Sequence, residues 1–262
     1  MSATDPPHSL DHYRDARYYD HAYRRYKIDV DFYVELAQTV GGPVMELGGG
    51  TGRISLALAR AGIEVVMVDR MPSMLRRAEA RFAKATKAVR ERITSVEGDL
   101  RDVDLGRTFP LVIGPFNVLQ HLYTRQDVER ALATVRRHLE EDGRFAFDVL
   151  VPEPSSLIRD PLRFYKNRPI KHPETGVRYG YAEAFEYDHD TQIQTTVIQF
   201  TPLDGGEPRY DRLMQRQFFP REVEALLHYN GFEILAHDGG FKDEPLDEYA
   251  ESQVVVARAR PA

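Results

Sequence analysis

Apolar positions follow two different periods between residues 43 and 149. Residues 44–47 and 65–68 are apolar runs of strand length, whereas the segment between them carries apolar side chains at helical spacing and ends at Gly62. Glycine readily adopts the left-handed conformation found at helix ends. Three more strands are predicted at residues 92–96, 109–113 and 143–149. Because helical segments separate the strands, the pattern predicts an α/β fold with a parallel sheet wound on both faces.

The pattern changes after Pro152. Residues 177–187, 192–200 and 212–219 are strand-like stretches joined by short polar turns, and no helical segment separates them. Strands connected in this way pair antiparallel, so we predict a three-stranded antiparallel insertion. A helix at about residues 221–229 and two strands at residues 232–236 and 253–257 follow it.

Composition restricts the class of protein further. The 262 residues include 35 Lys and Arg, 41 Asp and Glu, and no Cys, and the formal net charge is −6. This charge makes nucleic acid an unlikely partner, and the lack of Cys excludes a disulfide framework or a thiolate metal site. No apolar stretch approaches the roughly 18–20 residues of a membrane span, and the first residues lack a signal-peptide pattern. We therefore expect a cytoplasmic protein with no membrane partner.

A glycine cluster connects the first predicted strand to the first helix. Residues 44–53 read Val-Met-Glu-Leu-Gly-Gly-Gly-Thr-Gly-Arg, and the next strand ends at Asp69. A strand, glycine loop, helix, strand and carboxylate in this order are typical of α/β sites for adenosine-containing cofactors. A dinucleotide fingerprint requires glycine at its first, third and sixth positions. Counting from Gly48, the sixth residue is Arg53, which argues against a nicotinamide cofactor.

The spacing of Glu46, Gly48, Gly50 and Gly52 resembles the first motif of class I S-adenosylmethionine (SAM)-dependent methyltransferases. Gly49 departs from that family, whose members often have Cys, Ser or Ala there. The resemblance extends from about residue 19 to residue 257. It implies SAM as cofactor, S-adenosylhomocysteine (SAH) as product, and a doubly wound, mainly parallel, seven-stranded Rossmann-like methyltransferase sheet.

The resemblance also divides the chain into four parts. Residues 1–40 would form a helical lid arm and residues 41–151 the SAM-binding core. Residues 152–219 would form the antiparallel roof over the substrate, and residues 220–262 the last helix and a terminal hairpin that completes the core sheet.

Three further segments match the family in order and spacing. Asp69 stands where the family carboxylate binds the ribose hydroxyls, and Asp99 stands where an acid meets the adenine amino group. Residues 115–117, Pro-Phe-Asn, occupy the segment that lines the donor methyl group. The implied cofactor site contains Tyr19, Glu46, Gly48, Gly50, Asp69, Arg70, Met74, Asp99, Leu100 and Phe116.

Some of these residues have structural explanations as well. Asp69 could cap the helix that follows Pro72, and Asp99 could belong to an ordinary turn. Met74 lies on an apolar helical stripe, which is typical of core residues, and Phe116 suits the core as well as the site.

The N-terminal segment is rich in tyrosine. In similar methyltransferases a Tyr-Asp pair of this arm closes over the cofactor and reaches its carboxylate, and Tyr19 with Asp20 matches that pair. A tyrosine suits a lid because it offers apolar area and one polar tip. For any single tyrosine, amphipathic packing is the better explanation.

His121 and Glu183 are the candidate catalytic residues. His121 follows the fourth strand, at the edge where α/β sheets bind ligands, and an imidazole can accept a proton or orient a substrate near neutral pH. Glu183 lies on one face of a strand whose other residues on that face are mostly aromatic. The alternatives are a helix cap for His121 and a solvated edge strand for Glu183. Asp148 has no second ligand group, so no metal site is predicted.

The insertion indicates the class of substrate. Methyltransferases of this type that act on small molecules cover the site with such a sheet, which favours transfer to nitrogen or oxygen of a small molecule. The basic and aromatic segment at residues 159–168 permits an RNA substrate, although the negative net charge argues against it. An RNA or protein methyltransferase, a SAM-binding protein without activity, and SAM chemistry other than methylation are the alternatives. We expect a monomer or a homodimer.

Overall fold

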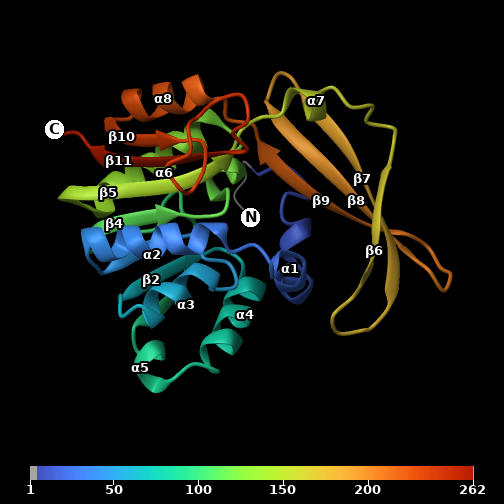
Figure 1. The fold of residues 1–262 in the computed structure, drawn as a ribbon, viewed down its shortest axis with the longest axis horizontal. Helices are drawn as coiled ribbons and strands as arrows, with labels where there is room; N and C mark the ends of the chain where they lie inside the picture. The colour runs from blue at the N-terminus through green and yellow to red at the C-terminus, as the bar shows by residue number, and fades with distance from the viewer. Residues whose placement is uncertain (1–4, 262) are drawn as a thin grey trace.

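The computed structural model describes residues 5–261, which form two sheets (Figure 1). The larger sheet has seven strands in the order β10-β11-β5-β4-β1-β2-β3. Its strands are β1 (Val44–Leu47), β2 (Val65–Asp69), β3 (Ile93–Glu97), β4 (Phe109–Gly114), β5 (Leu139–Leu150), β10 (Phe232–Asp238) and β11 (Ser252–Ala259). Strands β1 to β5 pair in parallel, and β11 pairs antiparallel with both β5 and β10. The predicted seven-stranded, mainly parallel sheet is thus confirmed.

Helices cover both faces of this sheet, so its central strands are buried on both sides. Apolar residues of α6 (Arg125–His138) and α8 (Pro220–Tyr229) form a core cluster with one face. Those of α2 (Ile28–Val40) and α3 (Arg53–Arg60) pack on the other face, where α4 (Pro72–Phe82) adds a smaller cluster. The remaining helical segments are η1 (Asp11–Tyr13), α1 (Ala16–Tyr23), α5 (Lys87–Arg90), η2 (Val118–His121) and α7 (Pro154–Leu157).

The inserted sheet has four strands, so the prediction of three was wrong. Its order is β6-β7-β8-β9, all antiparallel. The strands are β6 (Tyr165–Lys171), β7 (Arg178–Asp188), β8 (Ile193–Pro202) and β9 (Arg209–Arg216). The prediction missed β6 because this exposed edge strand is polar and contains Pro169. Strand β9 also ends earlier than predicted, since Phe218 is buried in the main core and Phe219 is the N-cap of α8.

The inserted sheet lies beside the carboxyl ends of the parallel strands, and α1 lies between α4 and the inserted sheet (Figure 1). One face of the inserted sheet packs on Tyr18 of α1, whose ring centroid is 5.3 Å from that of Phe200. The side chain of Gln120 in η2 anchors β9 to the core: its Nε2 donates to the carbonyl oxygen of Arg216 at 3.0 Å, and its Oε1 accepts from Gln215 at 3.1 Å. The inserted sheet and α1 therefore lie next to the carboxyl edge of the main sheet, where the glycine loop follows β1.

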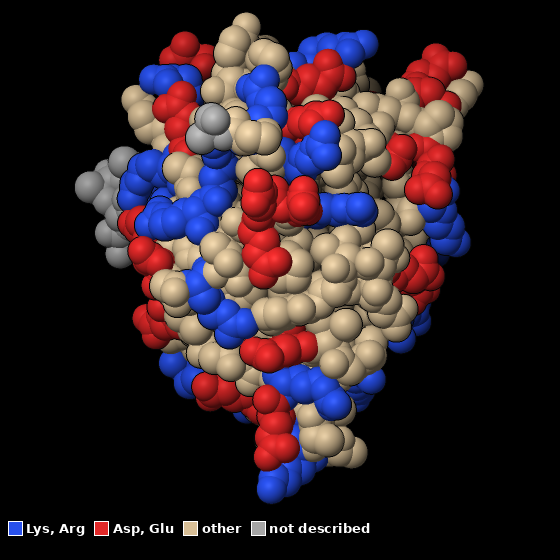
Figure 2. All heavy atoms as spheres, turned by 90° about the vertical axis from the view of Figure 1, so that its left-hand side faces the viewer, with Lys and Arg blue, Asp and Glu red and all other residues tan. Residues whose placement is uncertain are grey.

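The opposite side of the molecule, at the left of Figure 1, has no large area of one charge. Figure 2 shows acidic and basic side chains intermixed on that face, with uncharged residues between them. No helix within residues 5–261 is both long enough and apolar enough to cross a membrane. Residues 1–4 of the predicted arm and residue 262 of the predicted last segment lie outside the described residues.

Candidate functional site

A cavity of about 850 Å³ lies at the carboxyl ends of the parallel strands, under η1 and α1. Its size is that of a site for a small ligand or cofactor. All ten predicted cofactor residues line it, as does His121. Glu183 is not among the lining residues. The sequence thus located the cavity, and the individual roles of these residues stay predictions.

The glycine loop passes close to the segment after β4. Gly48 has φ +65°, and a Cβ atom there would lie 2.2 Å from Cγ2 of Val118. Only glycine satisfies both the conformation and the contact. At Gly49, where the family often has a small side chain, a Cβ atom would lie 2.1 Å from Cγ of Met67. The longer Met67 side chain therefore occupies the space that an alanine or serine would need.

Asp69 at the end of β2 organises this loop. Its Oδ2 accepts the amide of Gly50 at 2.7 Å, and its Oδ1 accepts the amide of Met71 at 2.8 Å. Burial raises the pKa of this carboxyl, while the two amides act in the opposite direction. Each carboxylate oxygen has a second lone pair, so Asp69 can hold the loop and still accept a ligand hydroxyl.

Glu46 in β1 is the most deeply buried acid of the cavity wall. The hydroxyl of Ser55 donates to its Oε2. Burial raises the pKa of Glu46 to about 7, against an ordinary value of 4.5. A nearby cation lowers the pKa of a carboxyl, so Glu46 would become ionised when a cationic group binds next to it.

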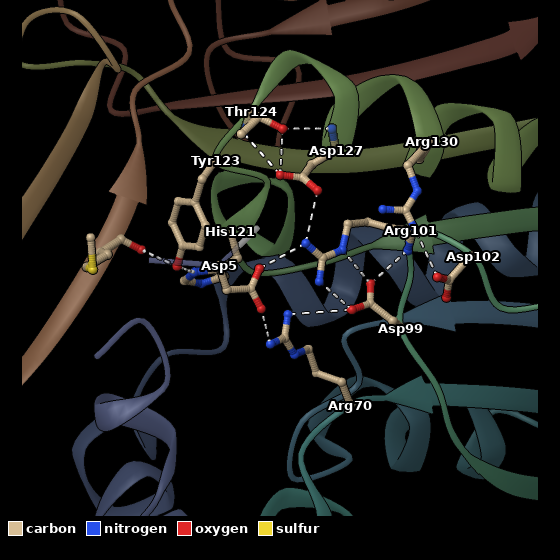
Figure 3. A network of polar contacts seen from close by, with 11 residues as sticks. Asp5, Arg70, Asp99, Arg101, Asp102, His121, Tyr123, Thr124, Asp127 and Arg130 are labelled. Atoms are coloured by element: carbon tan, nitrogen blue, oxygen red, sulfur yellow. Dashed lines mark hydrogen bonds and ion pairs between the residues drawn. The ribbon is translucent and has the colours of Figure 1, made fainter. Parts of the chain in front are cut away.

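Two arginines cross-link the end of the cavity where Asp99 lies (Figure 3). Arg101 donates to both oxygens of Asp99, at 2.9 Å and 2.6 Å, and also bonds Asp5 at 2.9 Å and Asp127 at 3.0 Å. Arg70 pairs with Asp5 and lies 3.5 Å from Asp99. These ion pairs hold the pKa values of Asp5 and Asp99 below their usual range, although burial opposes them. Nothing in the sequence indicated Asp5 or Arg101, because they meet only in the folded chain.

The N-terminal arm is fixed at its other end by Asp20. This carboxylate accepts from Thr51 at 2.6 Å, from Nε of Arg77 at 2.6 Å and from Nη2 of Arg81 at 2.5 Å. Tyr19 and Asp20 of the predicted pair both line the cavity, and Asp20 also ties the arm to the loop before α3 and to the second half of α4.

Phe116 and Asn117 form the turn after β4. Both have left-handed backbone conformations, with φ +59° and +62°. The Phe116 ring lies 5.1 Å from that of Tyr23 and 4.9 Å from that of Tyr26, measured between centroids. The guanidinium carbon of Arg53 lies 5.3 Å from the Phe116 ring centroid. Phe116 therefore belongs to the cavity wall and contacts the arm.

His121 lies between two tyrosines. Its Nε2 is 2.6 Å from Oη of Tyr13, its Nδ1 is 3.3 Å from Oη of Tyr123, and that hydroxyl donates to the carbonyl of Met214 at 3.3 Å. Burial lowers the pKa of His121 to about 4 and raises those of Tyr13 and Tyr123. All three groups are therefore neutral near pH 7. The sequence identified His121 but not its partner Tyr13, which belongs to a different part of the chain.

Glu183 lies on the face of the inserted sheet that packs on α1. It accepts a hydrogen bond from the hydroxyl of Tyr181 at 2.6 Å and one from Nδ2 of Asn167 at 3.1 Å. Asn167 belongs to β6, the strand missed by the sequence analysis. Within residues 5–261, no group of three or more His, Asp or Glu side chains is placed to hold a metal ion.

Known proteins share both the sequence pattern and the fold. The family model of a methyltransferase domain matches residues 44–143. The methyltransferase CcbJ of Streptomyces caelestis has a TM-score of 0.78 at 22% identity, and the match covers 94% of this chain and 98% of CcbJ. The cypemycin N-terminal methyltransferase of a Streptomyces species is 35% identical over 231 residues, 82% of each protein. The chain belongs to the class I SAM-dependent methyltransferases.

The glycopeptide N-methyltransferase MtfA is a further structural relative of this methyltransferase. Its TM-score is 0.62 at 26% identity, and the match covers 88% of this chain and 89% of MtfA. MtfA is also known in complexes with SAM and with SAH. SAM is accordingly the cofactor of this methyltransferase.

The residues of the cavity fit SAM chemically. SAM carries a sulfonium and an ammonium group, and the wall presents the carboxyls of Glu46, Asp69 and Asp99. The side-chain oxygen Oδ1 of Asn117, next to Phe116, is buried and has no hydrogen-bond partner among residues 5–261. When bound, SAM supplies an electrophilic methyl group. The methyltransferase has to align an acceptor with that methyl and exclude water.

Proposed function

We propose that the protein transfers the methyl group of SAM to an amine nitrogen of a small molecule or a short peptide. The observation that carries this proposal is the hydrogen bond between Tyr13 and His121, which both line the cavity. The aromatic rings of His12, Tyr19 and Tyr123 surround this polar pair, which offers a place to orient a nucleophile.

The protonation states suggest how the pair acts. With a pKa of about 4, His121 is too weak a base to take a proton from an ammonium group. Its neutral Nε2 can accept a hydrogen bond from the Tyr13 hydroxyl. The Tyr13 oxygen is then left with lone pairs that can accept an N–H of the acceptor amine. In this mechanism the pair orients a neutral amine, and the ammonium proton of the methylated product passes to solvent.

Two relatives support nitrogen over oxygen as the nucleophile. MtfA is an N-methyltransferase by name, the cypemycin enzyme is an N-terminal methyltransferase by name, and both matches cover more than four-fifths of this chain. Their names also refer to a peptide N-terminus and a glycopeptide, which favours an acceptor larger than a simple amine. Transfer to oxygen stays the alternative within the same chemistry.

Glu183 is proposed to attract a cationic or hydrogen-bonding part of the acceptor. It lies on the same face of the inserted sheet as Phe200, toward α1, and Tyr181 and Asn167 fix its orientation. Glu183 belongs to β7, an inner strand between β6 and β8, so it is not a carboxylate at the edge of the sheet.

RNA is the less favoured acceptor. Arginine side chains of the basic segment at residues 159–168 cover two nearby aromatic rings, which leaves these rings less open to stacking with bases. The guanidinium carbon of Arg159 lies 4.7 Å from the ring centroid of Phe185, and that of Arg163 lies 5.1 Å from the ring centroid of Tyr165. We further propose that the protein acts in the cytoplasm, as a monomer or a homodimer.

The test is a methylation assay with isotope-labelled SAM and four acceptor panels: amines, alcohols, short peptides with free N-termini, and RNA. We expect label in amine or peptide products, located on nitrogen by tandem mass spectrometry. Label on oxygen or in RNA would reject the nitrogen assignment. SAH binding without turnover on any panel would favour a SAM-binding protein without activity.

The matched variants are Tyr13→Phe and Tyr249→Phe. Tyr13 lines the cavity, whereas Tyr249 is 81% exposed. Loss of one hydrogen bond to the reacting group costs about 0.5–1.5 kcal/mol, so Tyr13→Phe should lower kcat roughly threefold to tenfold. Tyr249→Phe should leave it unchanged. Equal rates for the two variants would remove Tyr13 from the mechanism.

A further inference from the structure

The turn after β4 contains two successive residues with positive φ, neither of them glycine. Phe116 has φ +59° and Asn117 has φ +62°. Asparagine tolerates this region, but a bulky residue such as phenylalanine occupies it only when its surroundings enforce it. Strained backbone of this kind gathers at functional sites and needs a compensating contact.

One carboxylate supplies that contact. Asp148, near the end of β5, accepts the amide of Phe116 on Oδ1 at 2.8 Å and the amide of Asn117 on Oδ2 at 3.0 Å. The hydroxyl of Tyr33 in α2 donates to Oδ1 at 2.7 Å. Asp148 is 2% exposed and Tyr33 is fully buried. All three donors are uncharged groups, so hydrogen bonds from neutral donors stabilise the negative charge of Asp148.

The turn connects three parts of the site. Asn117 is the N-cap of η2, the short helix that carries His121. Val118 contacts the glycine loop at Gly48. The Phe116 ring packs on tyrosines of the arm. A change in the turn would therefore displace His121 and the wall of the cavity together.

We propose that Asp148 is a positioning residue for methyl transfer, whose two oxygens hold the Phe116–Asn117 turn and, through it, Phe116 and His121. The inference rests on the proposed function, because it assigns the turn a role in the same reaction. The ionised carboxylate is needed: it accepts from both amides, whereas an asparagine side chain would present one acceptor and one opposing N–H group. Burial raises the pKa of Asp148 to about 6, so it is ionised at pH 8.

The activity test compares Asp148→Asn with Asp238→Asn. Both carboxylates lie opposite Val254, one on each side of β11, but Asp238 holds no turn. At pH 8 we expect Asp148→Asn to lower kcat at least tenfold with a smaller change in the KM for the acceptor. Asp238→Asn should have no effect.

Rescue distinguishes positioning from general stability. Glycine adopts positive φ without cost, so the double variant Asp148→Asn/Asn117→Gly should recover at least threefold in kcat over Asp148→Asn. On the native background, Asn117→Ala should lower kcat at least threefold more than Asn117→Gly, since alanine disfavours this conformation. If glycine gives no recovery and the two Asn117 variants have equal rates, the proposal is wrong.

A measurement that needs no acceptor separates this proposal from the proposed function. Amide exchange with SAH bound should show the Phe116 and Asn117 amides protected in the native protein. The Asn117→Ala variant, which leaves Asp148 and the core intact, should lose at least tenfold of that protection. Unprotected amides in the native protein would overturn the role of Asp148. If the amides are protected but the protein methylates no acceptor, Asp148 still holds the turn, and only the proposed function is rejected.

Discussion

At the scale of single residues, Asp69 combines two tasks that are usually considered separately. It holds the glycine loop through two amides and lies at the cavity surface, where family members bind the ribose. Removing its side chain would therefore release the loop and delete the predicted ligand contact together. The two losses should appear as one reduction in cofactor affinity.

Asp69→Ala should weaken SAH binding by tenfold to over a hundredfold. A hydrogen bond to a charged group contributes about 1.5–3 kcal/mol, and each 1.4 kcal/mol is about a factor of ten in affinity. Glu97→Ala is the matched control, because Glu97 is the exposed partner of Asp69 in the register of β2 with β3. Isothermal titration calorimetry measures both. An unchanged dissociation constant for Asp69→Ala would exclude Asp69 from the site.

Glu46 should make stability depend on pH in a direction unusual for a carboxyl. Its pKa is about 7 in the folded protein, above the ordinary 4.5. The folded state therefore binds the proton more tightly, and this contribution to stability is present below pH 4.5 and lost as pH rises through 7. Between pH 5.5 and pH 8 the native protein should lose about 2 kcal/mol that Glu46→Gln keeps.

Urea denaturation of both proteins at the two pH values tests this expectation. The exposed Glu35→Gln serves as the control and should follow the native protein. If the difference between the native protein and Glu46→Gln is the same at both pH values, the burial of Glu46 does not control its proton affinity.

The cofactor residues could be predicted because they follow from local chain geometry: a strand end, a glycine loop and a helix start lie within a few residues of one another. Tyr13 and Arg101 could not be predicted in the same way. The Tyr13–His121 contact spans 108 positions and the Asp5–Arg101 contact spans 96. No pattern of hydrophobic spacing specifies which distant polar groups will meet.

At the scale of elements, the arm is attached by ion pairs on both sides of the cavity. Asp5 joins it to Arg70 and Arg101, and Asp20 joins it to Arg77 and Arg81. The inserted sheet adds a third attachment, from His172 to Asp15 at 2.9 Å. The opening of the arm should therefore depend on electrostatic contacts as well as on the packing of its tyrosines.

Asp20→Asn should increase the rate of SAH dissociation about fivefold to thirtyfold. Partly buried charged hydrogen bonds of this kind contribute on the order of 1–2 kcal/mol, and a cofactor under the arm can leave only when the arm opens. Hydrogen exchange should also speed up in α1. The control is Glu129→Gln, which removes an exposed ion pair with Arg125 on α6. An unchanged dissociation rate would show that Asp20 does not limit opening.

Strand β6 shows why one element escaped prediction. Its central residues, Lys166 to Pro169, are exposed, and they carry two cations and a proline. Such residues lower strand propensity, yet they are favoured on edge strands because they hinder pairing with another chain. The same residues hinder aggregation at this edge and make β6 difficult to predict from the sequence.

At the scale of the whole molecule, α8 closes the core after the chain returns from the inserted sheet. Leu227 on α8 is 2% exposed and borders an apolar cavity of about 30 Å³ next to β5 and η2. Leu227→Ala would enlarge this cavity and should cost about 3–5 kcal/mol in free energy of unfolding. Tyr229→Ala, on the exposed side of the same helix, should cost less than about 1 kcal/mol. Equal losses in urea denaturation would contradict this account of the core.

Both ends of the insertion are attached to one short stretch of chain at the start of β11, residues 251–253. The amide of Val151 donates to the carbonyl of Glu251 at 3.0 Å, and Nε2 of Gln253 donates to the carbonyl of Phe218 at 2.7 Å. The chain therefore leaves the main sheet and returns to it at nearly the same place. An insertion with adjacent ends can be exchanged without altering the connections of the remaining fold. Selection can therefore replace this one module, and with it the proposed acceptor contact of Glu183, without changing the residues predicted to bind SAM.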